Sequence, residues 1–249
     1  MPQSDADSIV RTLLRETFQN ERIGEKSGAF TRSGMSINEL PRLYELVRRN
    51  AIRNVLEIGM GHATSSIVIS RALADGGGGH LTSIDPFQTA QEKPGYASVG
   101  IQNLKRAGFA DHKLIELPDY LALPQLVADK AAFDFILVDG YHSFDYTLLD
   151  IFYADLLLRD GGVLCVHDSS WPAVYHAIRF MEQHKPYELL SPPPYMGSRS
   201  RLHALGRRIS LAASGRLAGF RERNRRWNTL VAYRKRESRM AAEKVFDAY

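Results

Sequence analysis

Apolar runs typical of β-strands alternate with amphipathic runs typical of helices through most of this chain, and this alternation constrains the fold strongly. Parallel strands joined by crossover helices give such a pattern, because each helix packs on one face of the sheet. The sequence therefore predicts a doubly wound α/β fold, with a mostly parallel seven-stranded sheet and helices on both faces. The expected strands are 54–59, 80–85, 112–117, 133–140, 163–168, 187–191 and 228–235. The expected helices are 63–75, 95–109, 119–130, 142–162 and 171–184, with Asp119 capping the third and glycines closing the fourth.

Charge is unevenly distributed along the 249 residues. The net charge is +4, but the segment from Arg201 to Trp227 holds eight arginines and one acid and carries +7 by itself. A nucleic-acid-binding protein usually spreads basic residues over a wider surface. The N-terminal residues lack the apolar core of a secretory signal, and no apolar run is long enough to cross a bilayer. The single cysteine, Cys165, lies in an apolar strand as a small buried side chain, and a cytoplasmic location is expected.

Polar residues follow the predicted strands beyond their carboxyl ends, which is where ligands bind in doubly wound sheets. Gly59 and Gly61 follow the first strand and permit a close backbone approach to a ligand. Asp85 follows the second strand, where a carboxylate can accept hydrogen bonds from both hydroxyls of a ribose. Thr64 stands where the dinucleotide-binding pattern has its third glycine. The sequence therefore favours a ligand that carries adenosine over a plain turn.

Three stretches resemble class I S-adenosylmethionine-dependent methyltransferases, in particular the small-molecule O-methyltransferase branch that includes macrolide-sugar methyltransferases. They read VLEIGMGHATSS, LTSIDPF and FDFILVDGYHSFDYTLLDIFYADLLLRDGGVLCVHD, within a region from Ser36 to His184. The resemblance implies a Rossmann-like methyltransferase fold with S-adenosylmethionine as cofactor, Asp85 at its ribose and Asp119 near its adenine. It also implies that the loop after the first strand surrounds the methionine part of the cofactor through Glu57, Gly59, Met60, Gly61, Ala63, Thr64 and Ser65.

A catalytic group is expected where the fourth and fifth strands end. Asp139 and Asp168 close these neighbouring strands, so their carboxylates can lie close together. The resemblance assigns the role of general base to His142, and the positive end of the following helix favours a neutral imidazole there. Mg²⁺ or Mn²⁺ bound by Asp139, Asp168 and His167 is one interpretation of the acids. The other is that Asp139 caps the next helix and Asp168 hydrogen-bonds its own loop, without a metal.

The resemblance also shapes the expected domains and partners. Residues 1–50 are expected to form an N-terminal helical cap, and residues 51–249 an S-adenosylmethionine-binding catalytic domain with an arginine-rich insertion at about 196–227. The expected function is methyl transfer to a hydroxyl of a small molecule such as a sugar, a phenol or a natural-product intermediate. Assembly into a homo-oligomer is common in this branch. Three aromatic residues are expected to wall the acceptor site: Tyr141, Phe144 and Trp171.

Two other functions remain open at this point. An RNA methyltransferase would keep the same cofactor loop and use the arginines to hold phosphates. No RNA-binding module is visible in the sequence, however, and only Phe220 and Trp227 stand among the arginines as aromatic residues for stacking. A noncatalytic or dinucleotide-binding α/β protein would leave the Asp-x-x-His spacing and the His-Asp pair without a purpose. A small-molecule acceptor is therefore expected in preference to nucleic acid.

Overall fold

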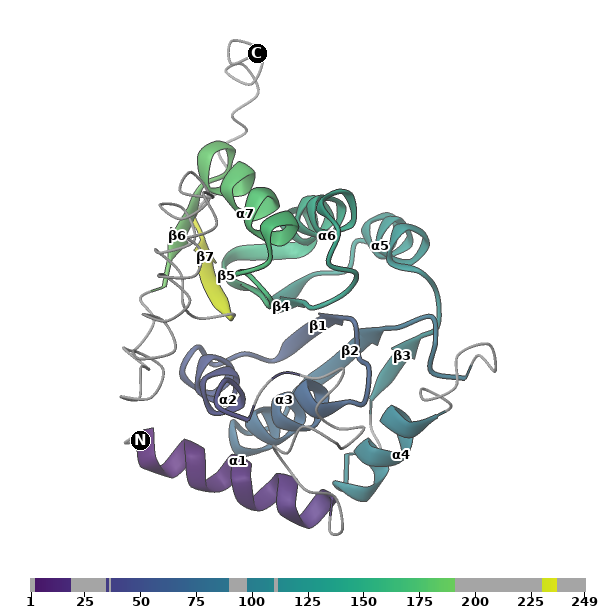
Figure 1. The fold of residues 1–249 in the computed structure, drawn as a ribbon, viewed down its shortest axis with the longest axis vertical. Coiled ribbons are helices and arrows are strands. Elements are labelled where there is room, and N and C mark those ends of the chain that lie inside the picture. Colours follow the sequence, from purple (N-terminus) through teal and green to yellow (C-terminus); the bar gives the residue numbers. More distant parts are fainter. Residues whose placement is uncertain are drawn as a thin grey trace, which may run out of the picture.

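The computed structural model describes residues 3–18, 35, 37–89, 98–109, 112–190 and 230–236. In these residues, strands and helices alternate through most of the chain (Figure 1). The strands are β1 (Asn54–Ile58), β2 (His80–Ile84), β3 (Lys113–Ile115), β4 (Phe133–Val138), β5 (Leu158–Val166), β6 (Tyr187–Leu189) and β7 (Val231–Lys235). The helices are α1 (Gln3–Thr17), α2 (Leu40–Arg49), α3 (Thr64–Asp75), α4 (Val99–Arg106), α5 (Asp119–Ala128), α6 (Phe144–Leu157) and α7 (Pro172–His184).

The strands form one sheet in the order β3-β2-β1-β4-β5-β7-β6. The five strands from β3 to β5 in this order run parallel, whereas β7 pairs antiparallel with β5 and β6 pairs antiparallel with β7. The direction of chain progression reverses between β1 and β4, which makes this the switch point where such sheets bind ligands. The predicted doubly wound, mostly parallel, seven-stranded sheet is confirmed.

The register of the central strands places their carboxyl ends at one level. Ile58 of β1 is paired with Ile84 of β2 and with Val138 of β4, and Val138 is paired with Val166 of β5. The backbone ladder continues for one further step beyond each of these residues. The first residues after four strands therefore follow one another along a single edge of the sheet: Gly59, Asp85, Asp139 and His167.

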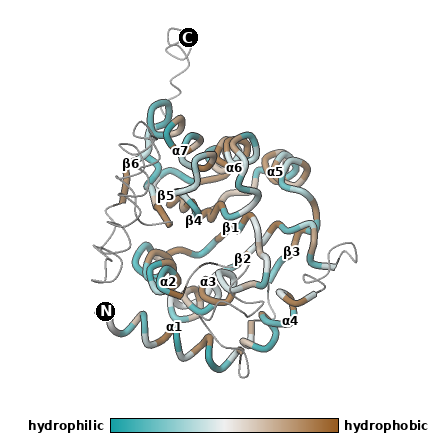
Figure 2. The backbone as a smooth tube through the Cα atoms, viewed as in Figure 1, coloured by the Kyte–Doolittle hydropathy of each residue, from teal (hydrophilic) through white to brown (hydrophobic). Residues whose placement is uncertain are grey.

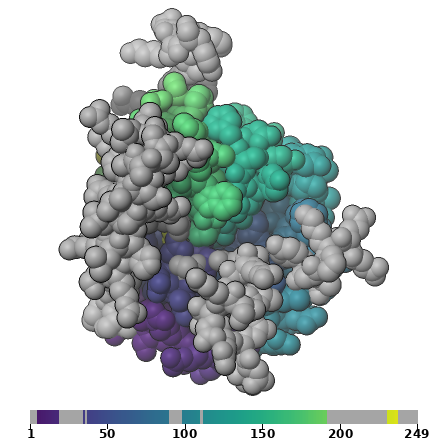
Figure 3. Space-filling model, in the orientation of Figure 1, coloured from purple at the N-terminus to yellow at the C-terminus, as the bar shows by residue number. Residues whose placement is uncertain are grey.

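Helices cover both faces of this sheet (Figure 1). Helices α5, α6 and α7 lie on one face and form a continuous outer surface in the space-filling view (Figure 3). Helices α2, α3 and α4 lie on the other face, and α1 packs outside them against α2. Neighbouring residues of β1 join opposite cores, because side chains alternate along a strand: Val55 packs with α1, α2 and α3, whereas Leu56 and Ile58 pack with α5, α6 and α7.

The two N-terminal helices are joined to the sheet through α3. Helix α1 alternates between hydrophobic and hydrophilic residues along its length (Figure 2), and its side chains Val10 and Leu14 are fully buried. Tyr44 of α2 is buried as well, and its hydroxyl donates a hydrogen bond of 2.8 Å to Asp75 at the end of α3. The domain boundary expected at residue 50 stays a prediction.

Two local predictions are wrong. Strand β5 begins at Leu158, so Gly161 and Gly162 lie inside the strand and do not close α6. A register shift between Phe133 and Phe135 of β4 accommodates this stretch, as a β-bulge does. Asp119 is the first residue of α5 and not its cap; the cap position is held by Pro118, which makes no side-chain capping bond.

The arginine-rich segment lies outside the described residues, as does the expected insertion at 196–227. Among the helices that the structure describes, none combines the length and the hydropathy that crossing a membrane requires.

Candidate active site

The loop after β1 is held tightly against the loop after β4. Gly59 has a φ of +90° and Gly61 a φ of +52°, a left-handed region that favours glycine. A methyl group on Gly59 would overlap the carbonyl oxygen of Asp139 and lie 2.7 Å from its carbonyl carbon. Ala63 also has a positive φ, of 65°, and α3 begins directly after it. Packing against Asp139 therefore requires glycine at position 59, whether or not a ligand also lies against this backbone.

Asp85 fastens this loop from the adjacent strand. Its Oδ2 accepts hydrogen bonds from the backbone N–H of Met60 at 3.2 Å and of Gly61 at 2.8 Å. Its Oδ1 accepts from the N–H of Phe87 at 2.9 Å, and the residue is 5% exposed. Asp85 lies at the predicted edge, where it shapes the glycine loop. Its expected contact with a ribose stays a prediction.

Glu57 lies at the centre of a buried hydroxyl cluster beneath the loop. Its carboxylate accepts hydrogen bonds of 2.6 Å from each of three serine hydroxyls, Ser65, Ser66 and Ser83. Complete burial raises the pKa of Glu57 to about 7, although the three hydroxyl donors oppose that shift. Glu57 and Ser65 therefore support the loop from inside, and the contacts with a cofactor expected of them stay predictions.

The raised pKa of Glu57 predicts a pH-dependent stability. The folded protein retains this proton up to about pH 7, whereas the unfolded chain loses it near the ordinary value of 4.5. The contribution of Glu57 to stability therefore falls as pH rises from 4.5 to 7 and is constant above that range. A Glu57→Gln variant should gain up to about 3 kcal/mol over the wild type between pH 5 and pH 8. Urea denaturation across this range measures the difference, and a gain that does not change with pH would contradict the assignment.

Thr64 supplies an unsatisfied polar atom at the start of α3. Its Oγ1 is buried and has no hydrogen-bond partner among the described residues. The first N–H groups of a helix also lack intrahelical partners, and they favour anionic groups. A buried hydroxyl without a partner costs free energy, and a bound ligand that accepts or donates a hydrogen bond here would remove that cost. Thr64 lies where the sequence predicts contact with the methionine part of a cofactor.

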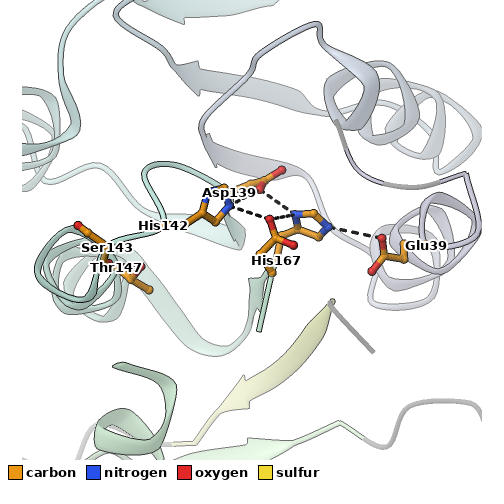
Figure 4. A network of polar contacts seen from close by, with 7 residues as sticks. Glu39, Asp139, His142, Ser143, Thr147 and His167 are labelled. Atoms are coloured by element: carbon orange, nitrogen blue, oxygen red, sulfur yellow. Dashed lines mark hydrogen bonds and ion pairs between the residues drawn. The ribbon is translucent and has the colours of Figure 1, made fainter. Parts of the chain in front are cut away.

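Four polar side chains gather where β4 and β5 end (Figure 4). His142 Nε2 lies 2.9 Å from Asp168 Oδ2 and 3.6 Å from Asp139 Oδ1. His167 Nδ1 lies 2.9 Å from the same Asp139 oxygen and 3.6 Å from Asp168 Oδ2. Asp168 has a φ of 50°, an unusual backbone conformation of a kind that is concentrated at functional sites. The structure thus brings together all four residues that the sequence predicts at this position.

Both histidines of this group are stabilised as cations. The nearby carboxylates of Asp139 and Asp168 raise the pKa of His142 to about 9, against the opposing effect of burial. Burial lowers the pKa of His167, but the carboxylates around it outweigh that effect and raise the pKa to about 11. The expectation of a neutral His142 is therefore wrong for the ligand-free protein. Two nearby carboxylates have a larger effect than the positive end of α6.

Glu39 adjoins this group of four through His167, and the sequence analysis did not identify it. It precedes α2, and its Oε2 lies 3.5 Å from His167 Nε2, so that both ring nitrogens of His167 face a carboxylate (Figure 4). No spacing or motif in the sequence connects residue 39 with residue 167, which lie 128 positions apart. Only the fold, in which α2 packs against α3, brings the two residues together.

One aromatic ring lies against this group, and two more aromatic residues lie close to His142 in the chain. The ring centroids of Trp171 and His142 lie 5.1 Å apart, and Trp171 is 52% exposed. Tyr141 and Phe144 are 70% and 44% exposed and adjoin His142 in the chain. Large apolar surfaces left in water beside polar groups are typical of binding sites. These three residues are where an acceptor wall was predicted, and that role stays a prediction.

The same edge continues to the loop after β3, where Asp119 begins α5. Asp119 is 9% exposed, and its Oδ1 accepts a hydrogen bond of 2.7 Å from the N–H of Tyr120. The glycine loop, Asp85, Asp119 and the group around His142 thus share one edge of the sheet. This is the arrangement of a site for an extended ligand beside a reactive group.

Comparison with known proteins bears directly on this arrangement, because residues 56–169 match a family model described as a methyltransferase domain. This part of the chain is therefore similar to a methyltransferase domain. It contains the glycine loop and all four residues of the group around His142.

Individual relatives agree with this similarity. A protein of Arabidopsis thaliana named as a caffeoyl-CoA O-methyltransferase is 31% identical over 169 residues, which cover 66% of this chain and 64% of that protein. The chain thus spans less than two thirds of that relative's length.

Two solved structures share the fold. The O-methyltransferase of Bacillus cereus in complex with S-adenosylhomocysteine has a TM-score of 0.56 and 21% identity, and covers 74% of this chain and 82% of its own. The O-methyltransferase TomG of Streptomyces achromogenes, involved in tomaymycin synthesis and bound to S-adenosylmethionine, has a TM-score of 0.54 and 17% identity over 95% and 100%.

Proposed function

We propose that this chain is an S-adenosylmethionine-dependent O-methyltransferase that acts on a hydroxyl group of a small molecule. The observation that carries the proposal is the group formed by Asp139, His142 and Asp168, which lies at the same sheet edge as the glycine loop. His142, held by two carboxylates near the glycine loop, is suited to remove the proton of a hydroxyl group that is methylated at this edge of the sheet.

The residues of the glycine loop fit the cofactor. The unpartnered Thr64 hydroxyl and the start of α3 suit the carboxylate of the methionine part, and Asp85 lies where a ribose is expected. Solved neighbours with the same fold carry S-adenosylhomocysteine or S-adenosylmethionine, which supports the same choice for this chain. The bound cofactor supplies a methyl group that its sulfonium already activates, so the protein mainly needs to orient the acceptor and manage one proton.

In this mechanism His142 takes the proton of the acceptor hydroxyl at Nδ1, because its Nε2 faces the Asp168 carboxylate. The imidazolium that Asp139 and Asp168 stabilise must first release its Nδ1 proton, and the His142 side chain is 31% exposed, so that proton can pass to water. Asp168 then orients the ring, because it is the carboxylate nearest to Nε2. His167, held between Asp139 and Glu39, keeps the Asp139 carboxylate in place.

The donor set also fits a divalent metal. Ligand atoms of the four residues in this group all lie within 4.8 Å of one another. Carboxylate oxygens suit Mg²⁺ and Mn²⁺, and imidazole nitrogens suit several divalent metals. Asp139, Asp168 and His167 would hold such an ion, which would lower the pKa of the acceptor hydroxyl. Without an ion, the two histidine cations balance the charges of Asp139 and Asp168, so the site also suits methyl transfer without a metal.

Cofactor binding is the first test. Isothermal titration should show binding of S-adenosylhomocysteine and none of NAD. An Asp85→Ala variant should bind S-adenosylhomocysteine about 10- to 100-fold more weakly, because it loses a charged acceptor and the anchor of the glycine loop. Asp134→Ala is the matched control, since Asp134 bonds to the N–H groups of Arg53 and Asn54 at the opposite edge of the sheet. Binding of NAD in place of S-adenosylhomocysteine would refute the proposal.

Methyl transfer is the second part of the test. Radiolabelled S-adenosylmethionine should transfer its methyl group to one member of a panel of sugars, phenols and natural-product alcohols, assayed with EDTA, Mg²⁺ or Mn²⁺. If activity survives EDTA, no metal is needed, and the role of Asp139 and Asp168 is only to orient His142. Methylation of tRNA without methylation of any small hydroxyl compound would replace the small-molecule acceptor with RNA.

A further inference from the structure

The side chain of Gln88, which follows β2, is completely buried beside the glycine loop. Its amide nitrogen donates hydrogen bonds to two oxygen atoms, the carbonyl oxygen of Gly61 at 2.7 Å and Asp85 Oδ2 at 3.1 Å. A carbonyl oxygen and a carboxylate oxygen can only accept, so both contacts require the N–H₂ side of the amide. Gln88 therefore connects the loop after β1 with the carboxylate after β2.

The contacts of Gln88 and Asp85 hold both polar groups of Gly61. Asp85 Oδ2 accepts the N–H of Gly61 at 2.8 Å, while Gln88 donates to the carbonyl of the same residue. Gly61 has a φ of +52°, and a glycine can adopt several other backbone conformations at little cost. The two hydrogen bonds together therefore favour one conformation of the loop over the others.

Two consecutive carbonyl groups of the loop are bound by buried side-chain amides. Gln88 binds the carbonyl of Gly61, and Asn103 of α4 donates a hydrogen bond of 3.1 Å to the carbonyl of His62. Asn103 is 3% exposed, and α4 lies on the same face of the sheet as α3 (Figure 1). In a trans peptide the N–H points opposite to the carbonyl. Because Gln88 binds the carbonyl of Gly61, the N–H of the same peptide group is directed away from Gln88.

The start of α4 holds Gln88 in place. The N–H of Ser98, directly before the helix, donates a hydrogen bond of 2.5 Å to the backbone carbonyl of Gln88. A methyl group on Gly100 would lie 2.6 Å from Gln88 Oε1 and 2.6 Å from the carbonyl oxygen of Gly61. Glycine forms helices less readily than alanine, so this close approach explains why glycine stands in the first turn of α4.

The other end of the Gln88 amide argues against a purely structural role. Gln88 Oε1 is buried and has no hydrogen-bond partner among the described residues. A buried polar atom without a partner lowers stability, and a methionine of similar length would not carry that penalty. The benefit of glutamine at position 88 is therefore its pair of donors, which orient the glycine loop.

We propose that Gln88 is a positioning residue for the cofactor: it holds the glycine loop in the conformation that accepts S-adenosylmethionine. It acts through Gly61 and Asp85 and does not need to touch the ligand. The inference rests on the proposed function, since it requires the cofactor to bind against this loop. Without the two donors, only a fraction of the molecules would hold the loop in this conformation, and the apparent affinity would fall by that fraction.

The test measures the association and dissociation rates of S-adenosylhomocysteine by surface plasmon resonance. Gln88→Met has a similar length without a donor, and its association rate should fall about tenfold with little change in the dissociation rate. Loss of a direct contact with the ligand would instead raise the dissociation rate. Gln88→Glu keeps the shape of the side chain but sets a carboxylate against Asp85 and the carbonyl of Gly61, so its association rate should fall further. A role in packing alone would give the opposite order of the two variants.

Two further variants approach the same contacts from α4. Gly100→Ala should also slow association about tenfold, because its methyl group would displace Gln88 and the Gly61 carbonyl from each other. Gln102→Met is the matched control, since Gln102 is exposed on the same helix, and its rates should equal those of the wild type. Urea denaturation of each variant shows whether the compared proteins are folded.

The outcomes separate this inference from the proposed function. A wild type that does not bind S-adenosylhomocysteine would refute both. A wild type that binds it, with unchanged association rates in Gln88→Met and Gln88→Glu, would refute the inference alone. A loss carried entirely by the dissociation rate would also overturn it, because Gln88 would then be a direct ligand contact. If the Gln88 variants do not fold, an unchanged association rate in Gly100→Ala would overturn the proposal.

Discussion

A Gly59→Ala variant is expected to lose binding of S-adenosylhomocysteine and to be destabilised by about 4 kcal/mol or more, at the upper end of single-residue effects. The added methyl group would overlap the carbonyl of Asp139, and the backbone at position 59 has a φ of +90°. The added methyl group would meet only backbone atoms of Asp139 and Gly140, so rotation of a side chain cannot relieve the clash. Urea denaturation and isothermal titration measure the two effects.

Gly78 provides the matched control for this variant. It has a φ of +97°, but a methyl group there would meet nothing within 4 Å. Gly78→Ala should therefore show only the cost of the left-handed backbone, about 1–2 kcal/mol, with full ligand affinity. Equal destabilisation by the two substitutions would show that the Asp139 contact does not determine the requirement for glycine at position 59.

Replacing His142 with alanine should lower turnover by about 10²–10⁴-fold, the usual contribution of a positioned base, and leave the affinity for S-adenosylhomocysteine nearly unchanged. The separation is expected because His142 contacts Asp168 and Trp171 beyond β4 and β5, whereas the glycine loop follows β1. Single-turnover methyl transfer and isothermal titration report the two quantities. His80→Ala is a suitable control, since His80 is exposed at the first residue of β2, at the other end of the strand.

Two results would contradict this role of His142. Full activity in His142→Ala would exclude it as the base. A loss of cofactor affinity as large as the loss of turnover would make it a structural residue of the site. In the second case the Asp139 carboxylate, which faces both histidines, would be the group to examine next.

The sheet was predictable because parallel strands are buried on both faces and appear as short, nearly continuous apolar runs. The run at 133–138 is the clearest example, and each of its pairings follows from the predicted alternation. The start of β5 was not predictable in this way. Its first residues include Arg159 and Gly161, which are typical of turns, and only the bulge opposite Phe133 shows how the sheet accommodates them.

The gathering of Asp139, His142 and Asp168 was predictable from strand ends alone, since neighbouring parallel strands bring the residues that follow them to one edge. The charge of His142 was not, because it depends on carboxylates contributed by two different strands as well as on its own helix. Asp150 carried a signal that was overlooked, because it directly follows two leucines in the mainly apolar run LLDIFYADLL and is completely buried. The sequence thus shows which ionisable residues reach the site, but their charge states depend on neighbours that only the folded structure brings together.

The approach of Glu39 to His167 has a consequence for how segments can be exchanged between this chain and its relatives. The residues that match the methyltransferase family begin at position 56, so an exchange of that segment between relatives would carry His167 but leave its carboxylate neighbour behind. The incoming histidine would then meet whatever residue the host places before its own second helix. Chimeras joined in front of β1 would therefore fold around an intact sheet and still vary in how firmly Asp139 is held.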